Sequence, residues 1–137
     1  MESFLLATLI NATVLQVLAG DRLQLQIHGQ QHSLALACID APHGNQGGAA
    51  SISRQQLKAL LPVGKRVLLQ PQGLDREGGT AMEVYRPGTH QPVNLQLVQR
   101  GWAFAQANQR WHCRRYPYGD AESEARRRGI GLWGWHE

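Results

Sequence analysis

The chain has 137 residues, the length of a single domain that buries roughly two thirds of its unfolded surface and can fold without cross-links. The net charge is +4, and arginines outnumber lysines by twelve to two, so most cations are planar groups suited to phosphate and carboxylate. This composition excludes a disulfide-dense scaffold and hints at a polyanionic partner.

The cysteines and the first residues bear on the compartment. Cys38 and Cys113 lie far apart and outside any CxxC pair, which is typical of a reducing compartment and predicts two buried free thiols. The apolar stretch 4–10 has no basic residue before it and is much shorter than the roughly 20 residues of a membrane span. We therefore expect a cytoplasmic protein without a membrane partner.

Apolar residues alternate along several segments with a period of two, which predicts strands separated by turns that contain glycine. Five strands are expected: two within residues 13–27, and one each at 32–39, 67–70 and 81–85. The third has apolar residues on both faces, so we expect it inside a barrel. A Gly-rich loop at 40–48 follows it.

Apolar residues at helical spacing predict three helices, at 49–61, from Pro92 to just before Gly101, and at 120–128. The order of the elements predicts an α+β fold, mainly β, in which a five-stranded Greek-key barrel carries the helices. Residues 1–11 are expected to be a lead-in, and residues 12–135 a single domain.

Four segments occur in a characteristic order: VLAGD at 17–21, CIDAP at 38–42, VNLQLVQRG at 93–101, and AESEAR at 121–126 followed by GLW at 131–133. Together they resemble the staphylococcal nuclease-like (thermonuclease) family over about residues 12–135. The resemblance implies an OB-fold barrel in which strand ends and the loop after the third strand hold a calcium ion and a phosphodiester.

The resemblance further implies that Asp21 and Asp40 are the two metal-binding carboxylates. Because calcium takes six to eight oxygen ligands, two carboxylates leave most of the coordination to carbonyls and water and predict weak binding. The alternative is that both aspartates satisfy only backbone groups of their turns, beside Gly20 and Pro42.

Catalytic groups of the family are replaced. By position, its glutamate falls on His43 and its two arginines fall on Ala35 and Gly79, while Ala19 and Arg22 alter its acidic turn. Losing one preorganised donor typically costs on the order of 100-fold to 1,000-fold in turnover. Losing two donors and the base predicts a catalytically impaired domain, a pseudoenzyme.

Neighbouring groups offer an alternative to impairment. Imidazole in general titrates near neutral pH, so His43 is the candidate catalytic base. Arg22, Arg76 or Arg86 would have to reach the phosphate from nearby turns. This alternative predicts an active calcium-dependent phosphodiesterase with a rearranged site.

Arginines alternate with aromatic residues in segment 110–118. Bases stack on such rings while guanidinium groups hold phosphates, as in surfaces that bind single strands, although a protein partner would use the same residue types. We therefore expect a module that binds single-stranded DNA or RNA, or a protein complex, with a purely structural subunit as a third possibility. The candidate binding residues are Arg22, Arg110, Trp111, Arg114, Arg115, Tyr116 and Tyr118.

The last helix has a plainer interpretation. Glu122 and Glu124 precede Arg126 and Arg128 by four residues, the favourable order for helical ion pairs. We expect a solvated helix face rather than a phosphate site.

Overall fold

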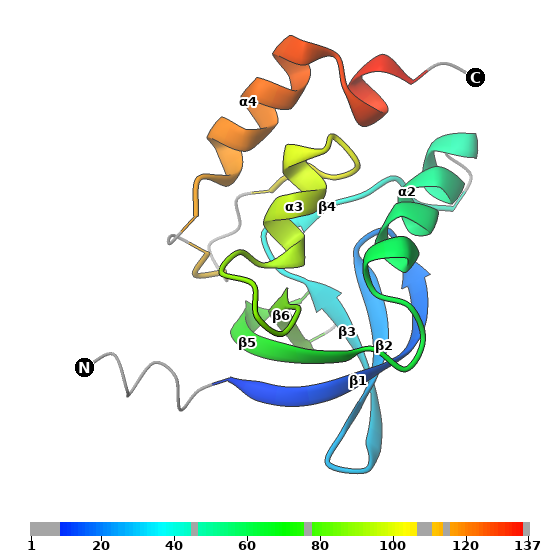
Figure 1. Cartoon of the computed structure of the whole chain (residues 1–137), viewed down its shortest axis with the longest axis vertical. Helices are drawn as coiled ribbons and strands as arrows, with labels where there is room; N and C mark the ends of the chain where they lie inside the picture. Colours follow the sequence, from blue (N-terminus) through cyan, green and yellow to red (C-terminus); the bar gives the residue numbers. More distant parts are fainter. Residues whose placement is uncertain (1–8, 45–46, 76–77, 107–110, 114–115, 136–137) are drawn as a thin grey trace.

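Five strands close into a barrel in the computed structural model (Figure 1). The structure describes residues 9–44, 47–75, 78–106, 111–113 and 116–135. The strand order is β1-β2-β3-β6-β5, and every neighbouring pair is antiparallel except β3 with β6. The strands are β1 (Ile10–Ala19), β2 (Arg22–Ile27), β3 (Gln30–Leu36), β5 (Arg66–Leu74) and β6 (Thr80–Tyr85). The predicted α+β fold with a five-stranded barrel is confirmed.

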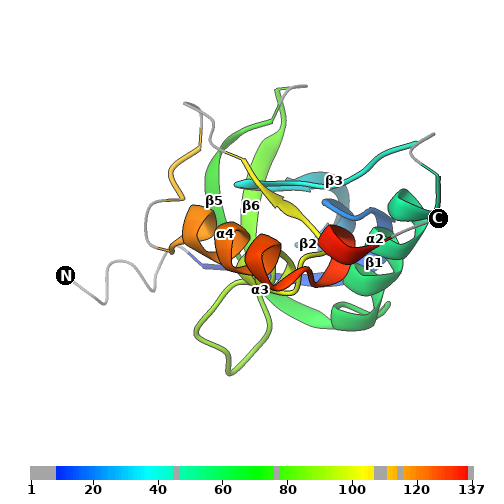
Figure 2. The same cartoon turned by 90° about the horizontal axis from the view of Figure 1, so that it is seen from above.

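In the described part of the chain, three α-helices lie on one side of the barrel, opposite the projecting β2–β3 hairpin (Figure 1). In the view from above, α4 lies over α3, and α2 lies further along the same side (Figure 2). Pro92 is the N-cap of α3, and Gly129 ends α4 in the left-handed conformation that favours glycine. The helices are α2 (Gly47–Leu60), α3 (Val93–Gln99) and α4 (Tyr118–Arg128), and the 3₁₀ helix η1 (Gly131–Gly134) follows.

Alternation along β1 and β2 places Val14, Val17, Leu23 and Leu25 in the core. Of the third strand predicted at 32–39, residues 34 and 36–39 are buried as expected, whereas the first four residues of β3 are exposed. They belong to the hairpin that extends beyond the barrel, so only the second half of the strand contributes to the core.

A buried amide joins α3 to the barrel. Asn94 is fully buried, and its Oδ1 accepts a hydrogen bond from the Val84 N–H at 2.9 Å. Its Nδ2 donates to the carbonyl oxygens of Ala37 and Met82, at 2.8 and 2.9 Å. The side chain therefore satisfies backbone groups at the point where β3 and β6 separate.

Two further short strands, β4 (Ile39–Asp40) and β7 (Phe104–Ala105), form a separate two-stranded sheet. Ile39 pairs with Ala105, and Asp40 pairs with Phe104. Strands of two residues leave no periodic signal, so the sequence did not predict this sheet. This pairing places β7, which follows α3, beside β4, where the Gly-rich loop begins.

The two cysteines are joined. Cys38 and Cys113 form a disulfide across 75 residues of sequence, with their Cα atoms 6.1 Å apart. The expectation of two free thiols is therefore wrong, and the cysteines no longer support a cytoplasmic location, since disulfides persist in oxidising compartments. Among the described residues, no helix has the length and apolar character needed to cross a membrane.

Candidate functional site

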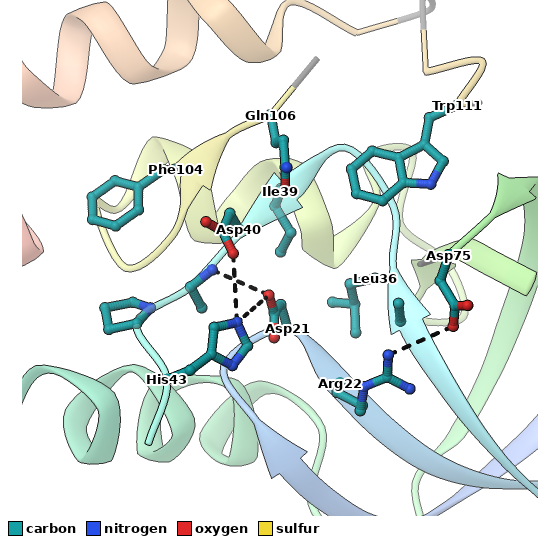
Figure 3. A pocket seen from close by; sticks show the side chains of 13 residues that line it. Asp21, Arg22, Leu36, Ile39, Asp40, His43, Asp75, Phe104, Gln106 and Trp111 are labelled. Atoms are coloured by element: carbon teal, nitrogen blue, oxygen red, sulfur yellow. Dashed lines mark hydrogen bonds and ion pairs between the residues drawn. The ribbon is translucent and has the colours of Figure 1, made fainter. Parts of the chain in front are cut away.

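A pocket of about 580 Å³ opens beside the β1–β2 turn, between the end of the barrel and the β4–β7 sheet (Figure 3). Charged groups gather at two places in it, and aromatic rings lie at its sides. The lining residues are Asp21, Arg22, Ala35, Leu36, Ile39, Asp40, Ala41, Pro42, His43, Asp75, Phe104, Gln106 and Trp111.

Gly20 allows the turn that carries Asp21 to approach its neighbours. A Cβ atom at Gly20 would overlap Ser53 Oγ and lie 2.8 Å from Ala41 Cβ. Ser53 is itself buried and donates a hydrogen bond of 2.7 Å to the Trp102 carbonyl. Because the Asp21 carbonyl also accepts the Leu36 N–H at 2.8 Å, the turn is fixed against both α2 and the end of β3.

Asp21, Asp40 and His43 form one cluster. His43 Nε2 lies 3.2 Å from Asp21 Oδ2 and 3.5 Å from Asp40 Oδ1. Asp21 Oδ2 also accepts the Ala41 N–H at 3.2 Å, so this aspartate does satisfy a backbone group of a neighbouring turn. Asp21 also lies close to the Asp40 carboxylate and to the His43 imidazole (Figure 3).

Burial raises the pKa of the Asp21 carboxyl above its ordinary value, and the nearby Asp40 raises it further. His43 and the Ala41 N–H act in the opposite direction, but burial has the largest effect. The Asp21 side chain is 13% exposed, whereas that of Asp40 is 49% exposed. The cluster thus contains one desolvated carboxylate that would gain from a cation.

The three side chains fit a divalent cation. One ligand atom from each of Asp21, Asp40 and His43 lies within 4.8 Å of the others. Two carboxylates suit calcium, with other oxygens supplied by carbonyls and water, whereas an imidazole nitrogen is a ligand more typical of transition metals. His43 therefore adds a nitrogen donor to the two carboxylates.

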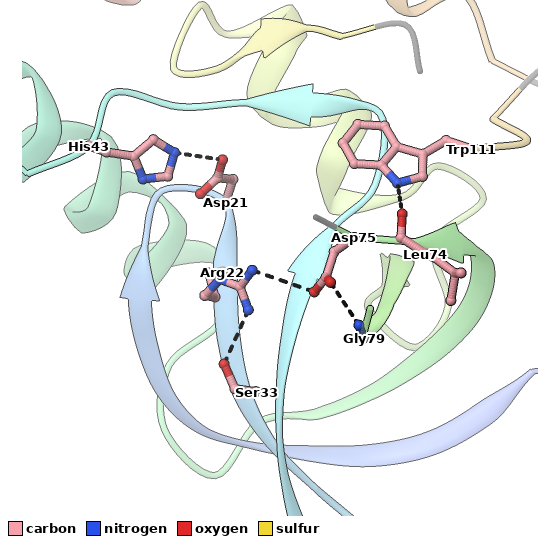
Figure 4. Close-up of polar contacts among 8 residues, drawn as sticks. All are labelled: Asp21, Arg22, Ser33, His43, Leu74, Asp75, Gly79 and Trp111. Atoms are coloured by element: carbon pink, nitrogen blue, oxygen red, sulfur yellow. Dashed lines mark hydrogen bonds and ion pairs between the residues drawn. The ribbon is translucent and has the colours of Figure 1, made fainter. Parts of the chain in front are cut away.

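Arg22 brings a guanidinium group to the other charged part of the pocket (Figure 4). It lies directly opposite Ala35 in the β2–β3 ladder, so its cation lies beside that position on the neighbouring strand. Its Nη2 lies 3.5 Å from Asp75 Oδ2, and its Nη1 donates to Ser33 Oγ at 3.3 Å. A buried carboxylate thus already balances this charge.

Asp75 also shapes the turn that contains Gly79. Its Oδ1 accepts the Gly79 N–H at 2.8 Å, which closes the β5–β6 turn. A Cβ atom at Gly79 would lie 3.1 Å from Asp75 Oδ2. Of the other arginines considered, Arg86 donates to Gln96 Oε1 on α3 instead, and Arg76 lies outside the described residues.

Two aromatic rings lie on opposite sides of the pocket (Figure 3). The Trp111 indole Nε1 donates to the Leu74 carbonyl at 3.0 Å, and Trp111 also makes an isolated β-bridge with Gly73. Phe104 packs edge-to-face against Trp133, with ring centroids 5.3 Å apart. The predicted binding residue Trp111 is therefore part of the same pocket as the acidic cluster.

The structure places the two tyrosines of segment 110–118 elsewhere. Tyr118 begins α4, is buried, and donates to Glu83 Oε2 at 2.5 Å. Tyr116 donates to the His90 carbonyl at 2.8 Å, and neither tyrosine lines the pocket. Arg110, Arg114 and Arg115 lie outside the described residues.

The pairing expected along α4 differs in detail. Glu124 pairs with Arg127, three residues later, at 2.6 Å, rather than with Arg128. Glu122 accepts the Ala105 N–H at 2.8 Å, and Arg126 lies over the Trp133 ring at 5.1 Å. Glu122 therefore anchors β7 to α4 instead of forming the predicted ion pair.

Asp75, Phe104 and Gln106 belong to the pocket, although the sequence did not single them out. A signal existed only for Asp75, which lies in the connection between the predicted strands at 67–70 and 81–85. The other two are brought in by the β4–β7 pairing and by a hydrogen bond of 3.0 Å from the Gln106 N–H to the Cys38 carbonyl.

Comparisons with known proteins agree with the fold. A family model described as staphylococcal nuclease homologue matches residues 33–135. The chain is also similar to a micrococcal nuclease of Shigella flexneri, with 34% identity over 129 residues. That similarity covers 88% of this chain and 71% of the relative.

Proposed function

Because the chain belongs to the staphylococcal nuclease homologue family, we propose that it binds single-stranded nucleic acid in this pocket and cleaves it poorly. The phosphodiester lies between Arg22 and the cluster of Asp21, Asp40 and His43. The observation that supports impairment is the ion pair of Arg22 with Asp75, because the guanidinium lining the described pocket is already balanced by a buried carboxylate.

Hydrolysis of a phosphodiester needs a base for the water and cations for the charge that develops on the phosphoryl oxygens. Ala35 and Gly79 supply no cation. To serve the transition state, Arg22 would have to give up part of its interaction with Asp75, which reduces the net gain. Ground-state binding of a phosphate is less demanding, since one guanidinium and aromatic surface suffice.

Asp21, Asp40 and His43 would hold a divalent cation, calcium being the ion that the family resemblance implies. Such a cation, when bound, supplies positive charge to a phosphate oxygen. The protein's own contribution is to desolvate Asp21 and to keep His43 Nε2 within 3.5 Å of both carboxylates.

The test is a titration of a fluorescent single-stranded oligonucleotide at two salt concentrations, with calcium and with a chelator. We expect salt-sensitive binding without measurable cleavage. Arg22→Ala should weaken binding and reduce the salt slope by about 0.7, the value for one phosphate contact on a single strand.

Arg66→Ala is the matched control, because Arg66 is an exposed strand arginine outside the pocket. Equal effects of the two substitutions would show that binding is general electrostatics. An oligonucleotide affinity too weak to measure would overturn the proposal and favour a protein partner on this surface.

A second candidate, an active calcium-dependent phosphodiesterase, is favoured by one observation. His43 Nε2 lies within 3.2 Å of Asp21, so the imidazole is oriented by a carboxylate, as a general base requires. This candidate predicts cleavage that rises through neutral pH, disappears in Asp40→Ala and falls in His43→Ala. Unchanged cleavage in His43→Ala would remove His43 from that role.

A further inference from the structure

We propose that Trp111 is the base-stacking residue of the pocket and that the Cys38–Cys113 disulfide positions it, so that preference for unpaired bases requires the oxidised chain. The inference rests on the proposed function, which concerns the phosphate. It adds the recognition of the base and a dependence on the redox state of one bond.

The disulfide connects the chain that leads to Asp40 with the segment that carries Trp111. Cys38 precedes Asp40 by two residues, immediately before β4. Cys113 follows Trp111 by two residues. One covalent bond across 75 residues of sequence therefore links the residue before β4, the strand that contains Asp40, to the segment that carries the indole ring.

The described hydrogen bonds of residues 111–113 to other segments are directed to β5. Trp111 Nε1 donates to the Leu74 carbonyl, and the His112 N–H donates to the Gln72 carbonyl at 2.9 Å. Individual hydrogen bonds at a partly exposed edge contribute little net stability. Trp111 and Cys113 also pack, partly buried, against the hydrophobic core. Because residues 111–113 belong to no helix or named strand, the disulfide is the covalent restraint that ties them to a distant part of the described chain.

The geometry suits an unpaired base. The indole N–H is occupied by Leu74, so the ring offers its face rather than a donor, and stacking on a face tolerates any base. Arg22 lines the same pocket and suits the phosphate. A duplex keeps its bases stacked on one another. Stacking on Trp111 together with a phosphate contact to Arg22 is therefore available only to a single-stranded nucleic acid.

The redox step is a thiol–disulfide exchange with a dithiol. A thiolate of the dithiol attacks one cysteine sulfur, and the Sγ–Sγ bond breaks to give a mixed disulfide and one cysteine thiolate. The second thiolate of the dithiol then attacks the mixed disulfide and releases the other cysteine as a thiolate. Two electrons and two protons pass to the protein, which gains two thiols. The dithiol becomes a cyclic disulfide.

The experiment compares three probes with the full chain: a labelled oligothymidylate, the same backbone with abasic sites, and a duplex. In the oxidised protein, Trp111→Ala should lower the affinity for oligothymidylate by about 5-fold to 150-fold, the range of base–aromatic stacking. Affinity for the abasic strand should not change. Dithiothreitol should have the same selective effect on the unsubstituted chain and no effect on Cys38→Ser/Cys113→Ser.

Comparing Arg22→Ala with Trp111→Ala tests base stacking separately from the phosphate binding of the proposed function. Arg22→Ala should weaken binding of both single strands, since each retains its phosphates. If Arg22→Ala weakens binding and Trp111→Ala does not, the stacking inference is overturned while phosphate binding stands. If the labelled oligonucleotides bind neither the two variants nor the unsubstituted chain, both the stacking inference and the proposed function are overturned.

Far-UV circular dichroism must show that the reduced chain is folded. Should it unfold, two glycines inserted after His112 provide the decisive variant, because they leave the disulfide intact and give the Trp111 segment slack. Loss of the preference for oligothymidylate over the abasic strand supports positioning by the disulfide. An unchanged preference in the inserted variant, or in a folded reduced chain, overturns it.

Discussion

His43 Nε2 lies 3.2 Å from Asp21 Oδ2, and this contact is the main side-chain compensation for a carboxylate that burial disfavours in its charged form. Burial raises the pKa of Asp21 above its unfolded value of 3.8. A raised pKa stabilises the fold below the unfolded pKa, and that contribution is lost as pH rises through the folded pKa. At neutral pH the ionised carboxylate is therefore a cost to folding.

Asp21→Asn should raise the free energy of unfolding at pH 7 by about 0.5–2 kcal/mol, the usual size of gains at sites shaped by function. The amide oxygen still accepts the Ala41 N–H, while the buried charge is removed. Urea unfolding at pH 7 and at pH 3.5 measures the effect, and the gain should shrink at the lower pH. Asp40→Asn, with a half-exposed side chain, should change stability little. A less stable Asp21→Asn at pH 7 would contradict the argument.

Two glycines provide a matched pair of alanine substitutions. Gly20→Ala should cost about 1–3 kcal/mol, the range for overpacking, because the new Cβ overlaps the buried Ser53 hydroxyl. Gly119→Ala, in the first turn of α4 with nothing within 4 Å of the new atom, should gain about 0.4–1 kcal/mol. Thermal unfolding of both variants tests the prediction, and equal shifts would contradict it.

The sequence predicted the barrel because its signals are local. Alternation marks β1 and β2, and Pro92 and Gly129 mark the ends of helices. Asp21 and Asp40 could be placed at one site because both belong to segments that resemble a family. The expected positions of these elements followed from periods of 2 and 3.6 residues, which each strand or helix displays by itself.

The remaining features depend on contacts between distant segments. The Cys38–Cys113 bond spans 75 residues, and cysteine spacing alone did not reveal it. The ion pair of Arg22 with Asp75 requires the register of β2 with β3 and the closure of the β5–β6 turn. Tyr118 was expected to be a binding residue, but its hydroxyl has a buried acceptor, Glu83, that only the tertiary structure supplies.

Asn94 gives a prediction about the join between α3 and the barrel. Asn94→Leu keeps a similar volume but leaves the Val84 N–H and the Ala37 carbonyl without this partner, so we expect a loss of about 2–4 kcal/mol. Asn11→Ala, an exposed substitution on β1, is the control and should stay within about 0.5 kcal/mol. Chemical denaturation checks both, and a loss at Asn94 no larger than at Asn11 would show that the network is dispensable.

The pair of Tyr118 and Glu83 makes stability depend on alkaline pH. Burial, followed by the charge of Glu83 and its hydrogen bond, raises the pKa of Tyr118 far above its ordinary value of 10.0. The folded phenol stays protonated where the unfolded phenol ionises, so its contribution is complete below pH 10 and declines as the pH rises further.

Tyr118→Phe should remove this part of the alkaline decline and should cost about 1–3 kcal/mol at pH 7, because Glu83 Oε2 loses its donor in a buried site. Urea unfolding between pH 8 and pH 11.5 measures both effects. Tyr116→Phe is the control: it leaves the bond between Tyr118 and Glu83 in place, so the alkaline decline should persist. If the slope above pH 10 is the same in Tyr118→Phe and in the unsubstituted chain, the decline arises from other groups.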